Sequence, residues 1–282
     1  MKIGVTGHSG FIGGAVAKAM GQEGHDIFLL DPYLRSKDAD RFDLKGCPER
    51  LDWVLHFAAT TSIRQSFEDP FYAYSNNLDS TILALKIAYK SKAAFLFMSS
   101  FVYGQPKYLP IDEKHPVSFA NPYMGSKLAG EEVSRSISET LAIPLIILRG
   151  SNIFGNCNIS GRLICDLLAS ARNGLPFILN DPEPRRDYLY IKDFQSLVVK
   201  IVTAGLPKPG IYNVGYGKDY SNIEVAEMAR RLSGNKFEIV IRRNSRPNDI
   251  LNCRIDAGLI KRTFNWVAEY TLESALKELI ET

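Results

Sequence analysis

The stretch that decides the fold is Gly7-His8-Ser9-Gly10-Phe11-Ile12-Gly13, which follows the apolar run Ile3 to Thr6 and opens the helical pattern Phe11 to Met20. The apolar run predicts a strand, and the pattern after it predicts a helix. Glycines at such a junction permit a tight turn and let a pyrophosphate approach the free N–H groups of the helix. The stretch therefore favours a dinucleotide-binding turn over a plain glycine-rich turn.

The next strand, Ile27 to Asp31, bears on the kind of dinucleotide. It ends at Asp31, 18 residues after Gly13. An acidic side chain at this place accepts hydrogen bonds from the adenosine ribose and repels a 2′-phosphate. Asp31 therefore favours NAD(H) over NADP(H), although Arg35 is close and Asp31-Pro32 could simply end the strand.

Apolar runs and helical patterns alternate through the first half of the chain, which predicts a parallel sheet covered by helices. Phe28-Leu29-Leu30 is continuously apolar, as strands buried on both faces are. We expect an α/β fold with a Rossmann-like, doubly wound parallel sheet, whose further strands and helices are Trp53 to Phe57, Asn76 to Ser91, Ala94 to Ser99, Tyr123 to Leu141 and Pro144 to Arg149.

The alternation of apolar runs and helical patterns becomes less regular after Arg149, where glycines, prolines and polar residues separate shorter apolar runs. We expect residues 1–150 to form a NAD-binding domain, to which the chain returns at about 188–214. Residues 151–282 are expected to form mainly a smaller C-terminal substrate-binding lobe. The remaining predicted elements are Asp193 to Ala204, Ile211 to Val214, Ser221 to Leu232 and Thr271 to Ile280.

Composition excludes several classes of protein. The 282 residues are 45% hydrophobic and 23% charged, which is typical of a globular chain, and a net charge of +3 does not indicate a nucleic-acid partner. No apolar run approaches the ~20 residues that a membrane span needs, and no signal-peptide core is seen. The four cysteines and four histidines lack ligand spacing, so we expect no metal site and a reduced, cytoplasmic setting.

Tyr123 and Lys127 lie four residues apart in a helical pattern, so they share one face of the helix. A phenol is a poor base at neutral pH, because its reference pKa is ~10. A nearby ammonium and a positive nicotinamide ring both favour the phenolate and lower that pKa. The pair therefore predicts a catalytic acid/base, although the same spacing also occurs on solvated helix faces.

Ser99 and Ser100 stand at the end of an apolar strand, which is the edge where open parallel sheets bind their ligands. A hydroxyl there could bond to the reacting oxygen and share a proton with Tyr123. The alternative is a polar strand end without a catalytic role.

The chain resembles the extended short-chain dehydrogenase/reductases, in the family of NAD-dependent sugar epimerases and dehydratases. The resemblance spans nearly the whole chain. It is carried by the glycine triplet, Asp31, Asp43-Leu44, His56-Phe57-Ala58-Ala59, Asn77, Ser99-Ser100, Val102-Tyr103-Gly104, Tyr123 with Lys127, Arg149 to Gly155, Arg186-Asp187-Tyr188 and Arg246-Pro247-Asn248-Asp249.

The resemblance implies a role for each matching residue. Tyr123 would be the acid/base, Lys127 its partner and a ligand of the nicotinamide ribose, and Ser99 the catalytic hydroxyl, with Ser100 also possible because the segment is one residue short. The implied NAD-binding residues are Gly7, Gly10, Phe11, Ile12, Gly13, Asp31, Asp43, Leu44, Phe57, Ala58, Ala59, Asn77, Tyr123 and Lys127. The implied ligands of a nucleotide-sugar are Ser100, Asn152, Arg186 and Arg246, whose guanidinium groups suit phosphate oxygens.

One difference from the family pattern reduces the number of reactions that the resemblance allows. Sugar dehydratases of the family usually carry Asp-Glu after the catalytic hydroxyl, whereas Ser100 and Phe101 follow Ser99 here. The resemblance therefore implies a nucleoside-diphosphate-sugar 4-epimerase, with a nucleotide-4-keto-sugar reductase as the alternative and a non-catalytic dinucleotide sensor as a weaker one. By the same resemblance, the helices Asn76 to Ser91 and Lys127 to Leu141 could form the contact of a homodimer.

Overall fold

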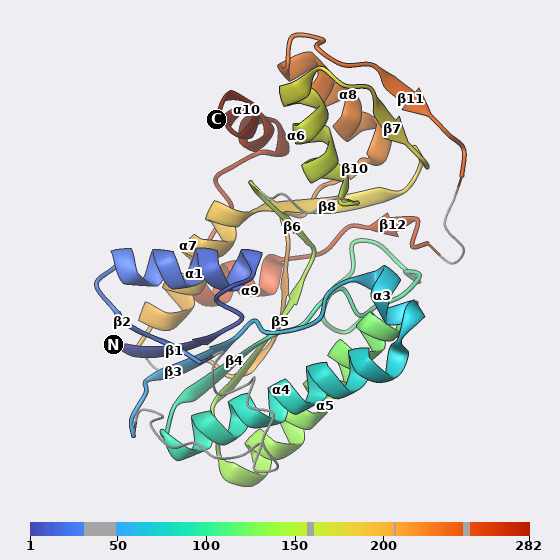
Figure 1. Cartoon of the computed structure of the whole chain (residues 1–282). Helices are drawn as coiled ribbons and strands as arrows, with labels where there is room; N and C mark the ends of the chain where they lie inside the picture. The colour runs from blue at the N-terminus through green and yellow to red at the C-terminus, as the bar shows by residue number, and fades with distance from the viewer. Residues whose placement is uncertain (31–48, 157–160, 206, 245–248) are drawn as a thin grey trace. The chain divides into compact units, whose positions relative to one another are not determined.

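The computed structural model describes residues 1–30, 49–156, 161–205, 207–244 and 249–282 (Figure 1). The chain divides into two compact units. The first comprises Met1–Tyr103, Pro116–Gly150 and Gln195–Tyr212, and the second comprises Gly104–His115, Ser151–Phe194 and Asn213–Thr282. Residues 104–115 thus belong to the second unit, although they lie inside the range expected for the first domain.

A six-stranded sheet forms the centre of the first unit, in the order β2-β1-β3-β4-β5-β9. The pairs β1·β2, β1·β3, β3·β4 and β4·β5 are parallel, which confirms the predicted fold class. The chain crosses from one side of β1 to the other, and ligands of such sheets bind beyond the carboxyl ends of the strands at this point. The strands are β1 (Lys2–Thr6), β2 (Asp26–Leu29), β3 (Trp53–His56), β4 (Ala94–Met98), β5 (Leu145–Gly150) and β9 (Gly210–Val214).

The helices of the first unit are α1 (Phe11–Gln22), α3 (Ile63–Glu68), α4 (Pro70–Lys90), α5 (Pro122–Leu141) and the part of α7 (Ile191–Thr203) from Gln195 on. Helix α4 begins at Pro70, six residues before the predicted start. Asp69 caps it, because its side chain accepts a hydrogen bond of 2.9 Å from the N–H of Tyr72, and a proline fits the first helical position.

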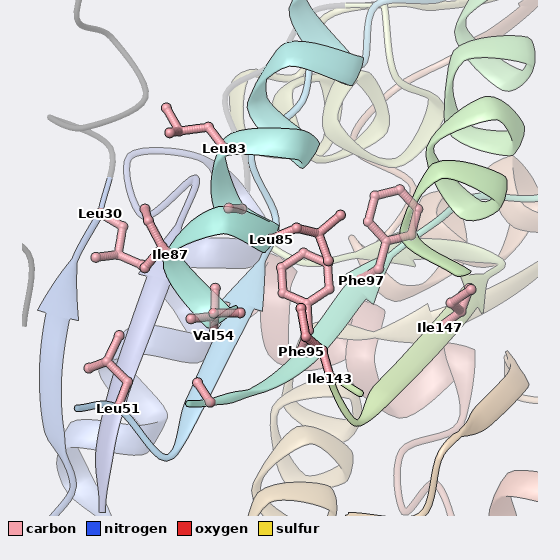
Figure 2. Packing of buried hydrophobic residues seen from close by; sticks show 13 residues of the cluster. Leu30, Leu51, Val54, Leu83, Leu85, Ile87, Phe95, Phe97, Ile143 and Ile147 are labelled. Carbon is pink, nitrogen blue, oxygen red and sulfur yellow. The ribbon is translucent and has the colours of Figure 1, made fainter. Parts of the chain in front are cut away.

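The hydrophobic core of this unit lies between α4 and the sheet (Figure 2). Leu85 and Ile87 of α4 are fully buried with Phe95 of β4 and Val54 of β3. Burying each such side chain stabilises the fold by ~1.5–3 kcal/mol. This core fixes the carboxyl ends of β1, β3 and β4, where the predicted site residues lie.

The second unit is built on short strands around β8 (Arg185–Tyr190). Helix α8 (Asn222–Leu232) starts at a capping box in which Ser221 and Glu224 bond reciprocally, which agrees with the predicted helix. Helix α6 and the short strands of this unit are not among the predicted elements, and the strands have too few residues to show a period. The other elements are β6 (Asn152–Phe154), α6 (Leu163–Asn173), β7 (Phe177–Leu179), β10 (Asp219–Ser221), β11 (Ile239–Ile241), β12 (Asn252–Cys253), α9 (Gly258–Phe264) and α10 (Leu272–Glu281).

Two expectations from composition can be compared with the described residues. No helix among them is both long enough and apolar enough to cross a membrane, and they hold no metal-binding group of three or more His, Cys, Asp or Glu. Cys253 is a free, buried thiol, whereas Cys165 is disulfide-bonded. The disulfide differs from the expectation of reduced cysteines, which rested only on the spacing of the cysteines in the sequence.

Candidate active site

The glycine turn joins β1 to α1 and has the conformation that the sequence predicts. Gly7 has a φ of +71°, which favours glycine, and its carbonyl accepts a hydrogen bond of 2.9 Å from the N–H of Gly10. A Cβ on Gly13 would lie 2.2 Å from the Gly7 oxygen, and a Cβ on Gly7 would lie 2.6 Å from the backbone nitrogen of Ala58. The turn is therefore closed against the start of its own helix and against the end of β3.

The same turn leaves the N-terminus of α1 open to an anion. Gly10 is the N-cap residue, it is exposed, and no side chain caps the helix. A Cβ on Gly10 would meet only the Gly7 oxygen within 4 Å, at 3.2 Å, and the first turn of α1 carries no acidic residue. Free N–H groups at a positive helix end fit the pyrophosphate of a dinucleotide. Phe11 and Ile12 begin this helix and are partly buried.

The carboxyl end of β3 lies beside this turn. The hydroxyl of Thr6 lies 2.8 Å from Nδ1 of His56 and accepts hydrogen bonds of 3.2 Å from the N–H groups of Phe57 and Ala58. Complete burial, and secondarily the charge of Lys127, hold the pKa of His56 well below its usual value. A neutral His56 therefore serves as a hydrogen-bonded support under residues 57–59, which are partly exposed.

Asn77 joins the segment after β3 to helix α5. Its side-chain oxygen accepts a hydrogen bond of 2.7 Å from the N–H of Thr60, and its amide donates to the Thr60 carbonyl (3.2 Å) and to the Ser126 hydroxyl (2.8 Å). Ser126 in turn donates to the carbonyl of Tyr123 at 2.8 Å. Asn77 is thus engaged in positioning the backbone around the site, and its side chain is buried.

Helix α5 presents the predicted catalytic pair. Asn121 caps the helix by accepting a hydrogen bond of 2.9 Å from Met124, so the helix begins at Pro122 and places Tyr123 in its first turn. Tyr123 is partly exposed, whereas Lys127, one turn later, is only 3% exposed. The Nζ atom of Lys127 lies 4.3 Å from the centroid of the Phe97 ring, where the ring face stabilises a cation.

Burial changes the charge of this lysine. Desolvation lowers the pKa of Lys127 to about 7, and the nearby carboxylate of Glu131 limits the decrease. Lys127 therefore gains or loses its proton in the neutral range. A group of this kind is suited to shift the pKa of a neighbouring phenol and to exchange protons with it.

The two serines after β4 differ in their surroundings. Ser99 is 3% exposed, and its hydroxyl donates a hydrogen bond of 2.5 Å to Oε1 of Glu131. Ser100 is partly exposed. The hydroxyl of Ser99 is therefore already committed to a carboxylate, and Ser100 is the more accessible of the two.

Of the predicted substrate ligands that the structure describes, Asn152 and Arg186 belong to the second unit, whereas Ser100 belongs to the first. Asn152 is exposed at the start of β6. Arg186 on β8 forms an ion pair with Asp249 at 2.8 Å and also donates to the Ile250 carbonyl at 2.5 Å. The remaining predicted site residues lie outside the described residues; these are Asp31, Asp43, Leu44 and Arg246.

Two residues of this region were not predicted as site residues. Glu131 is fully buried on α5, and Arg149 on β5 binds its carboxylate at 2.6 Å. The sequence does hold a signal for Glu131, because positions 123, 127 and 131 repeat at one helical turn. A glutamate on a helix is usually exposed, however, so the spacing alone does not indicate a buried charge.

The sequence and the fold are similar to those of known proteins. The sequence matches the NAD dependent epimerase/dehydratase family over residues 3–215. It is 28% identical to the UDP-glucose 4-epimerase of Bacillus subtilis, with 97% of this chain and 94% of the relative covered.

Two solved structures add to this likeness. The UDP-glucose 4-epimerase of Bifidobacterium longum in complex with NAD⁺ and UDP is 27% identical, with a TM-score of 0.86 over 99% of this chain and 97% of the other. RMD of Pseudomonas aeruginosa in complex with NADPH is 25% identical, with a TM-score of 0.86 over 99% and 97%.

Proposed function

Because the chain belongs to the NAD-dependent epimerase/dehydratase family and is an enzyme of that kind, we propose that it is a 4-epimerase of a nucleoside-diphosphate sugar. The observation that carries the proposal is the pairing of Tyr123 with the buried Lys127 on α5, in the same unit as the open glycine turn. The likeness to two UDP-glucose 4-epimerases supports it further.

NAD, when bound, would accept a hydride from C4 of the sugar and return it. The N-terminus of α1 at Gly10 would hold the pyrophosphate, and the backbone of residues 57–59 would line the diphosphate and ribose. Lys127 would bond to the nicotinamide ribose, while Asp31, Asp43 and Leu44 would contact the adenosine end. The open helix end and the absence of a Cβ at Gly10 support this placement.

Tyr123 would take the proton of the C4 hydroxyl and later return it. A positive charge on Lys127, one turn away, favours the phenolate form of Tyr123, so it lowers the pKa of the phenol toward the working pH. Since Lys127 has a pKa of about 7, its own charge is available mainly in neutral and mildly acidic solution. The pair therefore works over a limited range of pH.

Ser100 suits the role of the second catalytic hydroxyl better than Ser99 does. Its greater exposure leaves it open to a substrate oxygen, whereas Ser99 already donates to Glu131. We expect Ser100→Ala to impair turnover through the loss of this contact.

In the second unit, Arg186, Arg246 and Asn152 would hold the diphosphate and sugar. Guanidinium groups bind phosphate oxygens through paired hydrogen bonds. Arg186 already binds Asp249 at 2.8 Å, so a ligand phosphate would compete with that carboxylate or share the guanidinium with it.

A panel of nucleotide-sugars, with and without added NAD(H), tests the proposed reaction. An epimerase converts UDP-glucose, or another nucleotide-sugar, to its C4 epimer without net consumption of NADH. The second candidate, a 4-keto-sugar reductase, would consume one NADH for each product; the likeness to RMD, whose structure holds NADPH, favours it as the alternative. Conversion of no nucleotide-sugar under either condition would contradict both.

The closed packing at Gly13 leads to a prediction for cofactor binding. In Gly13→Ala, the new Cβ would lie 2.2 Å from the Gly7 oxygen, so the turn must move and the N–H groups of α1 lose their arrangement. We expect the Kd for NAD to rise about 10-fold or more, measured by calorimetry. The matched control is Gly21→Ala in the same helix, where the nearest atom would be 4.0 Å away and the affinity should not change. Equal affinity in both variants would contradict the assigned turn.

We also propose that the protein is a homodimer. Helices α4 and α5 pack together, and aromatic and apolar side chains on them remain exposed: Phe71, Tyr72, Tyr89 and Leu141. Light scattering after gel filtration should give twice the chain mass of 31.5 kDa. A single-chain mass at micromolar concentration would contradict this proposal.

A further inference from the structure

The buried carboxylate of Glu131 continues the line of Tyr123 and Lys127 along α5. It has no exposed surface and accepts hydrogen bonds from two groups. One is the hydroxyl of Ser99, at 2.5 Å; the other is the guanidinium of Arg149, through Nε at 3.0 and 3.1 Å and through Nη2 at 2.6 Å. Both carboxylate oxygens are thereby satisfied inside the protein.

Arg149 extends this contact to the loop after β4. Its Nη1 donates to the hydroxyl of Tyr103 at 3.3 Å, and its guanidinium lies 5.2 Å from the centre of the Tyr103 ring. The pair thus connects three parts of the first unit, namely α5, β5 and the segment from Ser99 to Tyr103. That segment includes Ser100.

Stability alone does not explain a charge pair at this place. Removing two charges from water is costly, and apolar side chains of similar volume often stabilise a core equally well or better. A pair with fixed, directional hydrogen bonds does, however, hold neighbouring groups in one geometry.

We propose that Glu131 and Arg149 are positioning residues of the active site: together they hold the Ser99–Ser100 segment against α5, and Glu131 supplies the negative charge beside Lys127. The inference rests on the proposed function. Neither residue touches a reacting group in this scheme, since each acts through Ser99, Ser100 or Lys127.

The groups that face Lys127 come from each element packed around it. On α5, the carboxylate of Glu131 interacts electrostatically with Lys127. His56 of β3 also interacts electrostatically with it, and the Phe97 ring of β4 lies against its ammonium group. Arg149 of β5 is held on Glu131. Glu131 raises the pKa of Lys127 against the effect of burial, and burial keeps His56 uncharged. Replacing Glu131 by a neutral residue should therefore lower the pKa of Lys127 below about 7.

The first test is Glu131→Gln, which keeps the shape of the side chain and removes its charge. If the charged form of Lys127 supports turnover, the alkaline limb of the kcat–pH profile should move to lower pH, and kcat should fall about 10- to 100-fold. The matched control is Glu132→Gln, because Glu132 is the exposed neighbour that pairs with Arg135. Its profile should equal that of the wild type.

A conservative variant separates the two parts of the proposal. Glu131→Asp keeps the charge but shortens the reach toward Ser99, so its alkaline limb should stay in place while kcat remains reduced. If this limb shifts as far as in Glu131→Gln, the assigned charge effect is wrong. If Glu131→Gln has normal kcat and a normal profile while Tyr123→Phe is inactive, the positioning role is wrong and the proposed function stands.

Two further measurements keep the proposal testable if Glu131→Gln does not fold or if no epimerase activity is found. Glu131→Gln leaves Arg149 buried without its partner and could unfold, so the double variant Glu131→Gln/Arg149→Met provides a neutral pair. It should melt cooperatively and show the same shifted limb; a normal rate and limb would overturn the proposal. Titration of the Lys127 side chain by ¹⁵N NMR without cofactor tests the charge effect even if no epimerase activity is found, and an unchanged pKa in Glu131→Gln would contradict it.

Discussion

Tyr123→Phe should lower the rate of epimerisation by about 10³-fold, within the range that general acid–base catalysis contributes. The variant removes one hydroxyl and keeps the ring, so α5 and the packing around Lys127 should be preserved. Steady-state kinetics with a nucleotide-sugar measure the loss, and calorimetry should give a Kd for NAD that changes much less than the rate.

The control for this variant is Tyr89→Phe on α4. Tyr89 is 52% exposed and belongs to the proposed dimer contact, not to the active site, and phenylalanine keeps its ring, so the turnover of this variant should equal that of the wild type. A rate within a few-fold of the wild type for Tyr123→Phe would remove the acid/base from the proposed mechanism. An equal absence of turnover in the wild type and in both variants, in every nucleotide-sugar assay, would favour a non-catalytic dinucleotide sensor.

Lys127→Met should abolish most turnover and at the same time stabilise the fold at low pH. Burial lowers the pKa of Lys127 from 10.5 to about 7, so the folded wild type carries an unfavourable charge below pH 7. The unfolded chain holds this proton up to about its ordinary pKa, so the stability of the wild type rises between pH 7 and 10.5. At about 1.4 kcal/mol per pKa unit, replacing Lys127 by methionine should raise the free energy of unfolding by on the order of 5 kcal/mol at pH 6 and by little near pH 10.

Urea unfolding at pH 6 and pH 9.5 measures this effect, with kcat at pH 7 measured in parallel. The control is Lys18→Met on α1, whose side chain is exposed and whose replacement should change the free energy of unfolding by less than about 0.5 kcal/mol at either pH. A Lys127→Met protein that is destabilised at pH 6, or that retains full turnover, would contradict the assigned state and role of the lysine.

The parts of the fold that the sequence predicted well are those with a period or a fixed turn. The apolar run Ile3 to Thr6 is a strand, the run from Ala94 is a strand that ends at Met98, one residue before the predicted end, and the pattern from Tyr123 to Leu141 is a helix. The glycine turn was predictable because its geometry excludes side chains at Gly7 and Gly13. Start positions were less predictable: Pro70 opens α4 because Asp69 caps it, whereas a proline read by itself suggests the end of a helix.

The site itself was predictable only in part. The spacing of Tyr123 and Lys127 indicated a shared helix face. The burial that lowers the pKa of Lys127 depends on tertiary packing, which places its ammonium group over the Phe97 ring of β4, and the spacing does not show this. Likewise, the resemblance implied Ser99 as the catalytic hydroxyl, and only the structure places this hydroxyl on Glu131. Asn77 had been expected to lie near the cofactor, and its contacts with Thr60 and Ser126 depend on tertiary packing.

The hydrogen bonds of Asn77 have a consequence for motion. Thr60 lies in a connecting segment, where backbone amides usually exchange quickly with solvent, yet its N–H is held by a side chain of the long helix α4. The same side chain holds Ser126 of α5, so opening this segment breaks a hydrogen bond that connects it to two packed helices. Its amide should therefore exchange more slowly with solvent than that of a loop residue without a protein partner, and hydrogen exchange followed by NMR measures the difference.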